Sequence, residues 1–244
     1  MIVERTEHPS WLSNAFLVAD GPGGHGVLVD GNGIVEPLYE AIERERITIT
    51  HVLLTHEHHD HVVDTAEFKA RFGVPVVAHA LTASAVGGVD EIVADGDVVQ
   101  SGALEISTIE TPGHSAGHVA FLVNGTDCLT ADCLFKGTVG GCSSRGETYE
   151  IHRRSIMDRL MTLPPETRIH PGHKEPSTIG EEWESNPFVR VWRGADPEGD
   201  EPCRVQGEDA TLVLWGPDYD GTHKAWVRFA DGDQIVGGSR VERL

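Results

Sequence analysis

The stretch from Thr55 to His61 reads THEHHDH and concentrates side chains that can bind a metal ion. Imidazole and carboxylate groups are the ligands that borderline first-row divalent metals prefer, zinc above all. On a helix, His56 and His58 would point in different directions, whereas in an extended or tightly turned segment side chains two residues apart lie on one side. We therefore expect a loop at a strand end that presents His56 and His58 together, with Asp60 and His61 at an adjacent position.

These residues make two incomplete half-sites, and three later turns can complete them. A Pro-Gly turn in the run PGHSAGH presents His114, and a second Pro-Gly turn in HPGH presents His173. Between them, the apolar run LTAD ends in Asp132, whose carboxylate could bridge two cations. Loops at strand ends commonly carry functional side chains on a rigid scaffold. Because the distant ligands follow in order, adventitious metal binding by a histidine-rich loop is disfavoured.

The remaining histidines are interpreted as structural or surface residues. His59 alternates away from the ligand side, which favours exposure or an outer hydrogen bond over ligation. Residues expected to be structural are His51, His79 and His170, and those expected at the surface are His8, His25, His152 and His223.

Short apolar runs separated by turns predict a mixed α/β arrangement over residues 1–195. Strands are predicted at residues 15–19, 26–30, 51–54, 74–78 and 169–170, with short strands over 93–130. Helices are predicted at residues 34–47, 62–73 and 150–163. Two α/β halves in series suggest sheets packed against each other with helices outside.

The C-terminal residues have a different pattern. Residues 197–202 are acidic and rich in turn formers, which is typical of a linker. Beyond them, residues 203–244 are predicted to form a small β-rich module, with strands at 211–215, 224–230 and 234–236. We expect this module to cover part of the core or to mediate self-association into a homo-oligomer.

Composition restricts the classes of function. The formal net charge is -20 and no basic cluster is visible, which argues against nucleic-acid binding. The four cysteines form no CxxC pair and are expected to be free thiols in a reducing cytosol. The sequence shows no signal peptide and no run approaching the ~20 apolar residues of a membrane span, so a cytoplasmic protein without a membrane partner is expected.

The motifs HEHHDH, PGHSAGH, TADCLFKG and HPGH, in this order, resemble the metallo-β-lactamase superfamily, and within it the glyoxalase II-like thioester hydrolases. The resemblance covers residues 10 to 190. It implies an α/β fold of four layers, an αββα sandwich, with the metal ions at one edge of the two sheets. The small C-terminal β-module stands outside this resemblance.

The resemblance also implies roles for individual residues. The first of two divalent metal ions, zinc with iron or manganese as alternatives, would be held by His56, His58 and His114. The second would be held by Asp60, His61 and His173, with Asp132 bridging both. Asp30 would orient the ligands from behind, as metal sites generally require. Apart from the resemblance, His118 is expected either to support the ligands in the same way or to be a structural residue of the core.

The chemistry implied is hydrolysis of a small-molecule thioester or ester, with Asp60 orienting a metal-bridging hydroxide. Gly141 stands where the family has an arginine, and the long helical C-terminal region that binds glutathione in larger glyoxalase II enzymes is missing. Lys136, Arg145 and Lys174 are candidates to bind a substrate carboxylate. Alternatives are a lactone or other ester hydrolase and a mononuclear-iron persulfide dioxygenase. An RNA-processing nuclease is a further alternative, which the negative net charge disfavours.

Overall fold

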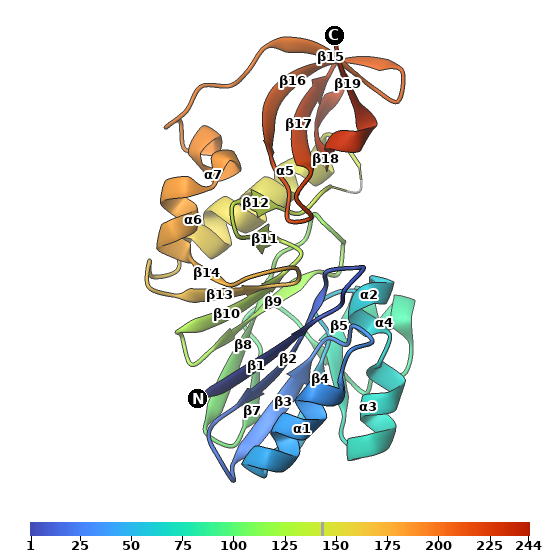
Figure 1. Ribbon diagram of the computed structural model, residues 1–244, viewed down its shortest axis with the longest axis vertical. Helices are drawn as coiled ribbons and strands as arrows, with labels where there is room; N and C mark the ends of the chain where they lie inside the picture. Colours follow the sequence, from blue (N-terminus) through green and yellow to red (C-terminus); the bar gives the residue numbers. More distant parts are fainter. Residues whose placement is uncertain (143) are drawn as a thin grey trace.

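The computed structural model describes residues 1–142 and 144–244. Two six-stranded sheets pack face to face, and a separate five-stranded sheet lies at one end of the elongated molecule (Figure 1). Helices lie on the outer faces of the two large sheets. This arrangement confirms the predicted αββα layers.

The first sheet has the strand order β1-β2-β3-β4-β5-β6. Its strands are β1 (Ile2–Glu7), β2 (Asn14–Ala19), β3 (His25–Val29), β4 (Thr48–Leu53), β5 (Val76–His79) and β6 (Glu91–Val93). Strands β3 to β6 are parallel. The helices between them are α1 (Glu36–Glu45), α2 (His59–Val62), α3 (Thr65–Phe72) and α4 (Ala80–Val86). Gly73 ends α3 in the left-handed conformation, with φ 65°, as its position in the sequence predicts.

The second sheet has the order β14-β13-β10-β9-β8-β7. Its strands are β7 (Val98–Ser101), β8 (Leu104–Glu110), β9 (Val119–Val123), β10 (Asp127–Ala131), β13 (Arg168–Pro171) and β14 (Ser177–Thr178). Strand β9 is antiparallel to both β8 and β10, and β13 is parallel to β10. Strands β8, β10 and β13 therefore run in one direction and end at the same edge. A short hairpin, β11 (Leu134–Phe135) and β12 (Thr138–Val139), follows β10.

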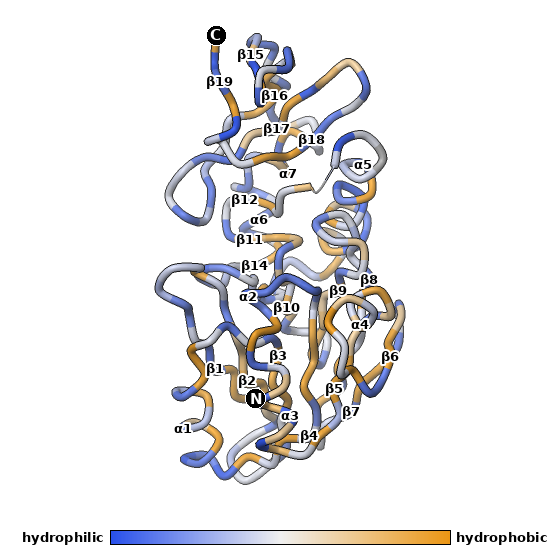
Figure 2. The backbone as a smooth tube through the Cα atoms, turned by 90° about the vertical axis from the view of Figure 1, so that its right-hand side faces the viewer, coloured by the Kyte–Doolittle hydropathy of each residue, from blue (hydrophilic) through white to orange (hydrophobic). Residues whose placement is uncertain are grey.

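The core between the two sheets is built from alternate apolar residues of both. Val27 and Val29 of β3 pack there with Ile106 of β8 and Phe121 of β9, all fully or almost fully buried. On the outer face of the first sheet, Leu38 of α1 belongs to a second apolar cluster. Figure 2 shows the hydrophobic residues following the strands, with hydrophilic residues in the connecting loops.

The outer face of the second sheet is covered by helices from the second half of the chain. These are α5 (Glu147–Arg154), which continues through a π turn (Ser155–Arg159) and a 3-10 turn (Leu160–Thr162), followed by α6 (Ile179–Ser185) and α7 (Pro187–Trp192). Asn186 caps α7, since its side chain accepts hydrogen bonds from the first backbone N–H groups of that helix. None of the helices in the described part of the chain is both long and apolar enough to cross a bilayer.

The C-terminal sheet is antiparallel throughout, with the order β18-β17-β16-β15-β19. Its strands are β15 (Glu201–Val205), β16 (Glu208–Pro217), β17 (His223–Phe229), β18 (Gly232–Gly237) and β19 (Val241–Arg243), with a 3-10 turn at Gly238–Arg240. Cys203 and Val227 lie in a small core of its own, whereas Trp226 and Ile235 pack into the apolar cluster under α5 to α7. The predicted division of the chain after residue 195 stays a prediction.

Several elements differ from those predicted. Strand β1 and helices α4, α6 and α7 were not predicted, because each is short and its apolar periodicity is weak. Asp60 and His61 lie on the single helical turn α2, where the sequence predicts a loop, and they stand next to His56 and His58 as expected. The predicted surface position of His152 is wrong, because its side chain is fully buried. Its Nε2 donates a hydrogen bond to the carbonyl oxygen of Gly140 at 3.1 Å. The four cysteines are buried free thiols, as expected.

Candidate metal centre

The loops that carry the candidate ligands all follow the carboxyl ends of strands. Asp30 follows β3, His56 follows β4, His114 follows β8, Asp132 follows β10 and His173 follows β13. Since β3 is parallel to β4, and β8, β10 and β13 run in one direction, each sheet presents its loops at a single edge. Packing the two sheets together brings these edges side by side, and this position is what the resemblance implied.

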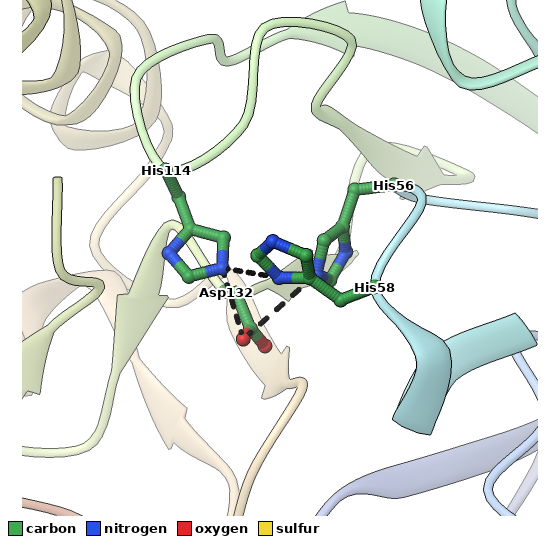
Figure 3. Close-up of side chains that lie close together, drawn as sticks. All are labelled: His56, His58, His114 and Asp132. Carbon is green, nitrogen blue, oxygen red and sulfur yellow. Dashed lines mark hydrogen bonds and ion pairs between the residues drawn. The ribbon is translucent and has the colours of Figure 1, made fainter. Parts of the chain in front are cut away.

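The first group of ligands is formed by His56, His58, His114 and Asp132, whose side chains point toward one another in Figure 3. Nδ1 of His58 lies 3.1 Å from Nε2 of His56 and 2.9 Å from Nε2 of His114. Oδ2 of Asp132 lies 3.4 Å from Nε2 of His114. Ligands ~2.0–2.1 Å from a tetrahedral zinc ion stand about 3.3 Å apart, so this spacing suits a zinc-sized cation.

The second group is formed by Asp60, His61 and His173. Oδ2 of Asp60 lies 3.7 Å from Nε2 of His61 and 3.7 Å from Nε2 of His173. Asp132 reaches this group as well, since its Oδ1 lies 3.3 Å from Nε2 of His61 and its Oδ2 lies 3.3 Å from Nε2 of His173. The structure therefore brings all seven predicted ligands together, with Asp132 between the two groups.

Among the described residues, three buried polar atoms of the candidate ligands lack a hydrogen bond, and one of them is Nδ1 of His173. Nε2 of His61 and Oδ1 of Asp132 are inaccessible to solvent and have no hydrogen-bond partner among the described residues. Leaving such groups unpaired costs about 1–3 kcal/mol each, and a metal ion would satisfy both. The donor set is nitrogen and oxygen only, which suits zinc, iron or manganese. The residues present thus fit two divalent cations.

Asp30 lies behind the second group and holds His61. Its carboxylate accepts hydrogen bonds from the backbone N–H and the hydroxyl of Thr55, at 2.9 and 2.7 Å, and from Nδ1 of His61 at 3.1 Å. With its proton on Nδ1, His61 presents the lone pair of Nε2 to the centre. Both oxygens of Asp30 thus accept hydrogen bonds from Thr55 or His61, so we interpret it as an orienting residue although it lies near His56 and His61.

The first group is held from behind by two contacts. Nδ1 of His114 donates to the carbonyl oxygen of Gly141 at 2.9 Å, which leaves Nε2 free for a cation. Nε2 of the buried His118 accepts a hydrogen bond from the backbone N–H of Asp132 at 3.1 Å, and its Nδ1 lies 2.8 Å from the hydroxyl of Thr111. His118 therefore positions the backbone of Asp132 and does not ligate. His59 is exposed and contacts the ring of Trp11, as expected for a non-ligand.

Burial and neighbouring charges set the protonation states of the candidate ligands, and His61 differs from the others. Burial lowers the pKa of His56 well below its ordinary value and lowers the pKa of His114, so both rings are neutral at pH 7. Burial alone would raise the pKa of Asp132, but His173 and His61 outweigh it and hold the pKa well below its usual range. Burial opposes a charge on His61, but Asp132 and Asp30 raise its pKa well above the ordinary value. A cation would take the place of this proton.

The three candidate substrate residues lie in different surroundings. Lys136 is exposed in the turn between β11 and β12. Arg145 forms ion pairs with Glu208 and Asp231 of the C-terminal sheet, at 2.7 and 2.9 Å. Lys174 lies next to His173, but its ammonium pairs with Glu7 at 3.1 Å. Binding of substrate by these residues stays a prediction.

The structure adds a residue that the sequence did not indicate. Tyr219, in the turn between β16 and β17, stacks on His173 with ring centroids 4.2 Å apart and an interplanar angle of 15°. Burial raises the pKa of Tyr219, and the carboxylate of Asp132 raises it further, so the phenol is protonated at neutral pH. No local pattern could have pointed to it, because its place depends on how the C-terminal sheet packs.

Comparison with known proteins agrees with this geometry. Residues 9–173 match the model of the metallo-beta-lactamase superfamily. The chain is 33% identical over 206 residues to an uncharacterized protein of Mycobacterium tuberculosis, covering 72% of this chain and 92% of that one. It is 34% identical over 212 residues to a hydroxyacylglutathione hydrolase of Chelativorans sp., covering 72% of this chain and 82% of that one.

A solved structure shares the fold. The crystal structure of TTHA1623 in a di-iron-bound form is 30% identical, with a TM-score of 0.64, and the match covers 76% of this chain and 100% of that one. The family match spans most of the chain and includes every candidate ligand from His56 to His173. This chain belongs to the metallo-β-lactamase superfamily, as a metal-binding enzyme of that fold.

Proposed function

We propose that the protein is a dinuclear metal-dependent hydrolase that cleaves a small-molecule thioester. The observation that carries the proposal is the position of Asp132, whose two carboxylate oxygens face the ligands of both groups. A carboxylate shared in this way is suited to holding two cations close together. We propose zinc as the metal. Iron is the alternative, because the related structure of TTHA1623 is in a di-iron-bound form.

Different residues of the chain would have different roles in the proposed hydrolysis. When bound, two cations would lower the pKa of a water molecule and stabilise negative charge on an acyl oxygen. Asp60 is the one partly exposed carboxylate of the seven ligands, with 27% of its side chain accessible, so it can orient the attacking water and accept its proton. Asp30 and His118 hold His61 and Asp132 in place and keep this geometry fixed.

A cysteine nucleophile is disfavoured. Burial raises the pKa of Cys128 and of Cys142 to about 12, and it raises the pKa of Cys133 well above its ordinary value. Thiols of this kind are inert at neutral pH. A water molecule activated at the metal centre would therefore be the nucleophile.

The thioester preference is supported by the name of the Chelativorans relative, a hydroxyacylglutathione hydrolase. To test it, zinc-loaded protein is assayed with S-lactoylglutathione, an N-acetylcysteamine thioester and a lactone. We expect thioester turnover that falls at least ~100-fold in Asp60→Ala and Asp132→Ala, since even residues behind metal ligands contribute 10–100-fold. Asp209→Ala, at the surface, is the control. Undiminished turnover in both ligand variants would exclude the mechanism.

A further inference from the structure

The C-terminal sheet is hydrogen-bonded to the loop at Gly141 and Cys142, which contacts the first group of ligands. The backbone N–H of Cys142 donates to the carbonyl oxygen of Ile235 at 3.0 Å, and the side-chain amide of Gln234 donates to the carbonyl oxygen of Cys142 at 3.3 Å. Both partners belong to β18. The neighbouring carbonyl, that of Gly141, accepts the hydrogen bond from His114. A strand of the C-terminal sheet therefore supports a ligand of the metal centre.

The same sheet reaches the second group through aromatic rings. The stacked pair of Tyr219 and His173 is joined by Phe135 of β11. The ring of Phe135 lies edge-on to Tyr219, with centroids 5.0 Å apart, and edge-on to His173 at 5.6 Å. Such aromatic contacts contribute about 0.5–1.5 kcal/mol each beyond burial of their area. The turn between β16 and β17 is thus fixed against the ring of a ligand.

A buried lysine holds this turn in place. Lys224 of β17 is 5% exposed, and its ammonium lies 3.0 Å from Oδ1 of Asp218. The same ammonium lies over the rings of Tyr219 and Phe135, 5.2 and 5.6 Å from their centroids. The carboxylate of Asp218 also accepts the backbone N–H of Tyr219 at 2.8 Å. This network sets the direction of the Tyr219 ring.

The hydroxyl of Tyr219 is available to a ligand. The residue is partly exposed, its ring stacks on the ring of His173, and among the described residues no side chain or backbone group is hydrogen-bonded to its hydroxyl. A phenol hydroxyl can donate a hydrogen bond, and a ring stacked on His173 would bring this donor beside an acyl group bound at the metal centre.

We infer that the C-terminal sheet completes the active site, with Tyr219 as a residue that donates a hydrogen bond to the acyl oxygen of a thioester or ester substrate. Lys224 and Asp218 act through Tyr219 and are positioning residues. The inference rests on the proposed function, since it needs an acyl substrate at the metal centre. It assigns the C-terminal sheet a part in substrate recognition.

The test uses the full-length, zinc-loaded chain and the variant Tyr219→Phe, which keeps the ring and removes only the hydroxyl. We expect kcat for thioester hydrolysis to fall about tenfold, with zinc content unchanged, because one hydrogen bond to developing charge is lost. The matched control is Tyr149→Phe, since Tyr149 stacks on Trp226 of the C-terminal sheet and accepts a hydrogen bond from Trp192. This control should keep the wild-type kcat.

A second readout does not depend on turnover. Binding of a ketone analogue, in which a methylene group replaces the thioester sulfur, is measured by calorimetry on the wild type, Tyr219→Phe and Tyr149→Phe. Binding weakened several-fold in Tyr219→Phe alone supports the contact, even if the wild type hydrolyses no thioester and the proposed function fails. Unchanged kcat and binding in Tyr219→Phe, loss of its zinc, or no binding by the wild type would each overturn the inference.

Discussion

Gly172 lies so close to Asp132 that a Cβ atom on residue 172 would stand 2.1 Å from Oδ1 of Asp132. The same atom would be 3.0 Å from Cε1 of His61. Close approach of the backbone, not an unusual dihedral angle, therefore requires glycine between β13 and His173. The absence of a side chain lets ligands from both sheets meet.

The first prediction concerns this contact. Gly172→Ala should displace Asp132 or His61, so that the protein binds fewer than two equivalents of zinc and loses most of its thioester hydrolysis. Zinc is measured by metal analysis after removal of free ions. Gly21→Ala, where a Cβ atom would meet nothing within 4 Å, should bind zinc like the wild type. Full zinc content in Gly172→Ala would show that the backbone can shift without cost.

The second prediction concerns the residue behind His61. In Asp30→Asn, an amide N–H₂ replaces one of the oxygens that accept from Thr55 and His61, so at least one of these hydrogen bonds is lost. We expect zinc affinity to fall about 10–100-fold. The affinity is measured by competition with a chromogenic chelator, with Asp209→Asn as the surface control. Equal affinities of the two variants would rule out an orienting role for Asp30.

The third prediction concerns how the free energy of unfolding depends on pH. Burial lowers the pKa of His152 to about 3 in the folded protein, below the ~6.5 of an unfolded chain. Between these values the unfolded chain binds a proton that the folded protein does not, so the free energy of unfolding decreases as the pH falls from ~6.5 toward ~3. In metal-free protein, urea unfolding at pH 7 and pH 4.5 should show a smaller decrease for His152→Gln than for the wild type. An identical decrease in the free energy of unfolding would show that protonation of His152 does not contribute to the loss of stability.

The fourth prediction concerns the buried pair of Lys224 and Asp218. Lys224→Met leaves Asp218 without its partner, and we expect the free energy of unfolding of the C-terminal sheet to fall by about 3–5 kcal/mol. Asp218→Asn combined with Lys224→Met should recover part of this loss, because no unpaired charge remains. Lys69→Met, which breaks a half-exposed pair with Asp90, should cost less than ~1 kcal/mol. Denaturant unfolding followed by tryptophan fluorescence gives these free energies. Equal losses in Lys224→Met and Lys69→Met would show that the buried pair stabilises the protein no more than an exposed one.

The sequence indicates which candidate ligands lie together because each of them is marked by a local signal. His56 and His58 stand at a strand end, and His114 and His173 follow Pro-Gly turns, so their types and spacing can be recognised before the fold is known. The layers could be predicted for the same reason, from apolar runs that alternate with turns.

What could not be predicted depends on contacts between distant segments. His152 has a polar side chain in an amphipathic helix, and its contacts with Gly113 and with the carbonyl oxygen of Gly140, both distant in the sequence, place it in the interior. Tyr219 lies in a hairpin turn of ordinary composition, and its contact with His173 exists because the C-terminal sheet packs on the helices and loops of the main body. Propensity and periodicity carry no information about such contacts.

The central claim is that two cations act together in hydrolysis, and a titration tests it most directly. Metal-free protein is titrated with zinc while the initial rate of thioester hydrolysis and the bound metal are measured at each step. We predict that the rate rises until two equivalents are bound per chain and then stays constant. A protein that binds one iron per chain, hydrolyses no thioester and consumes oxygen with a persulfide would contradict the account.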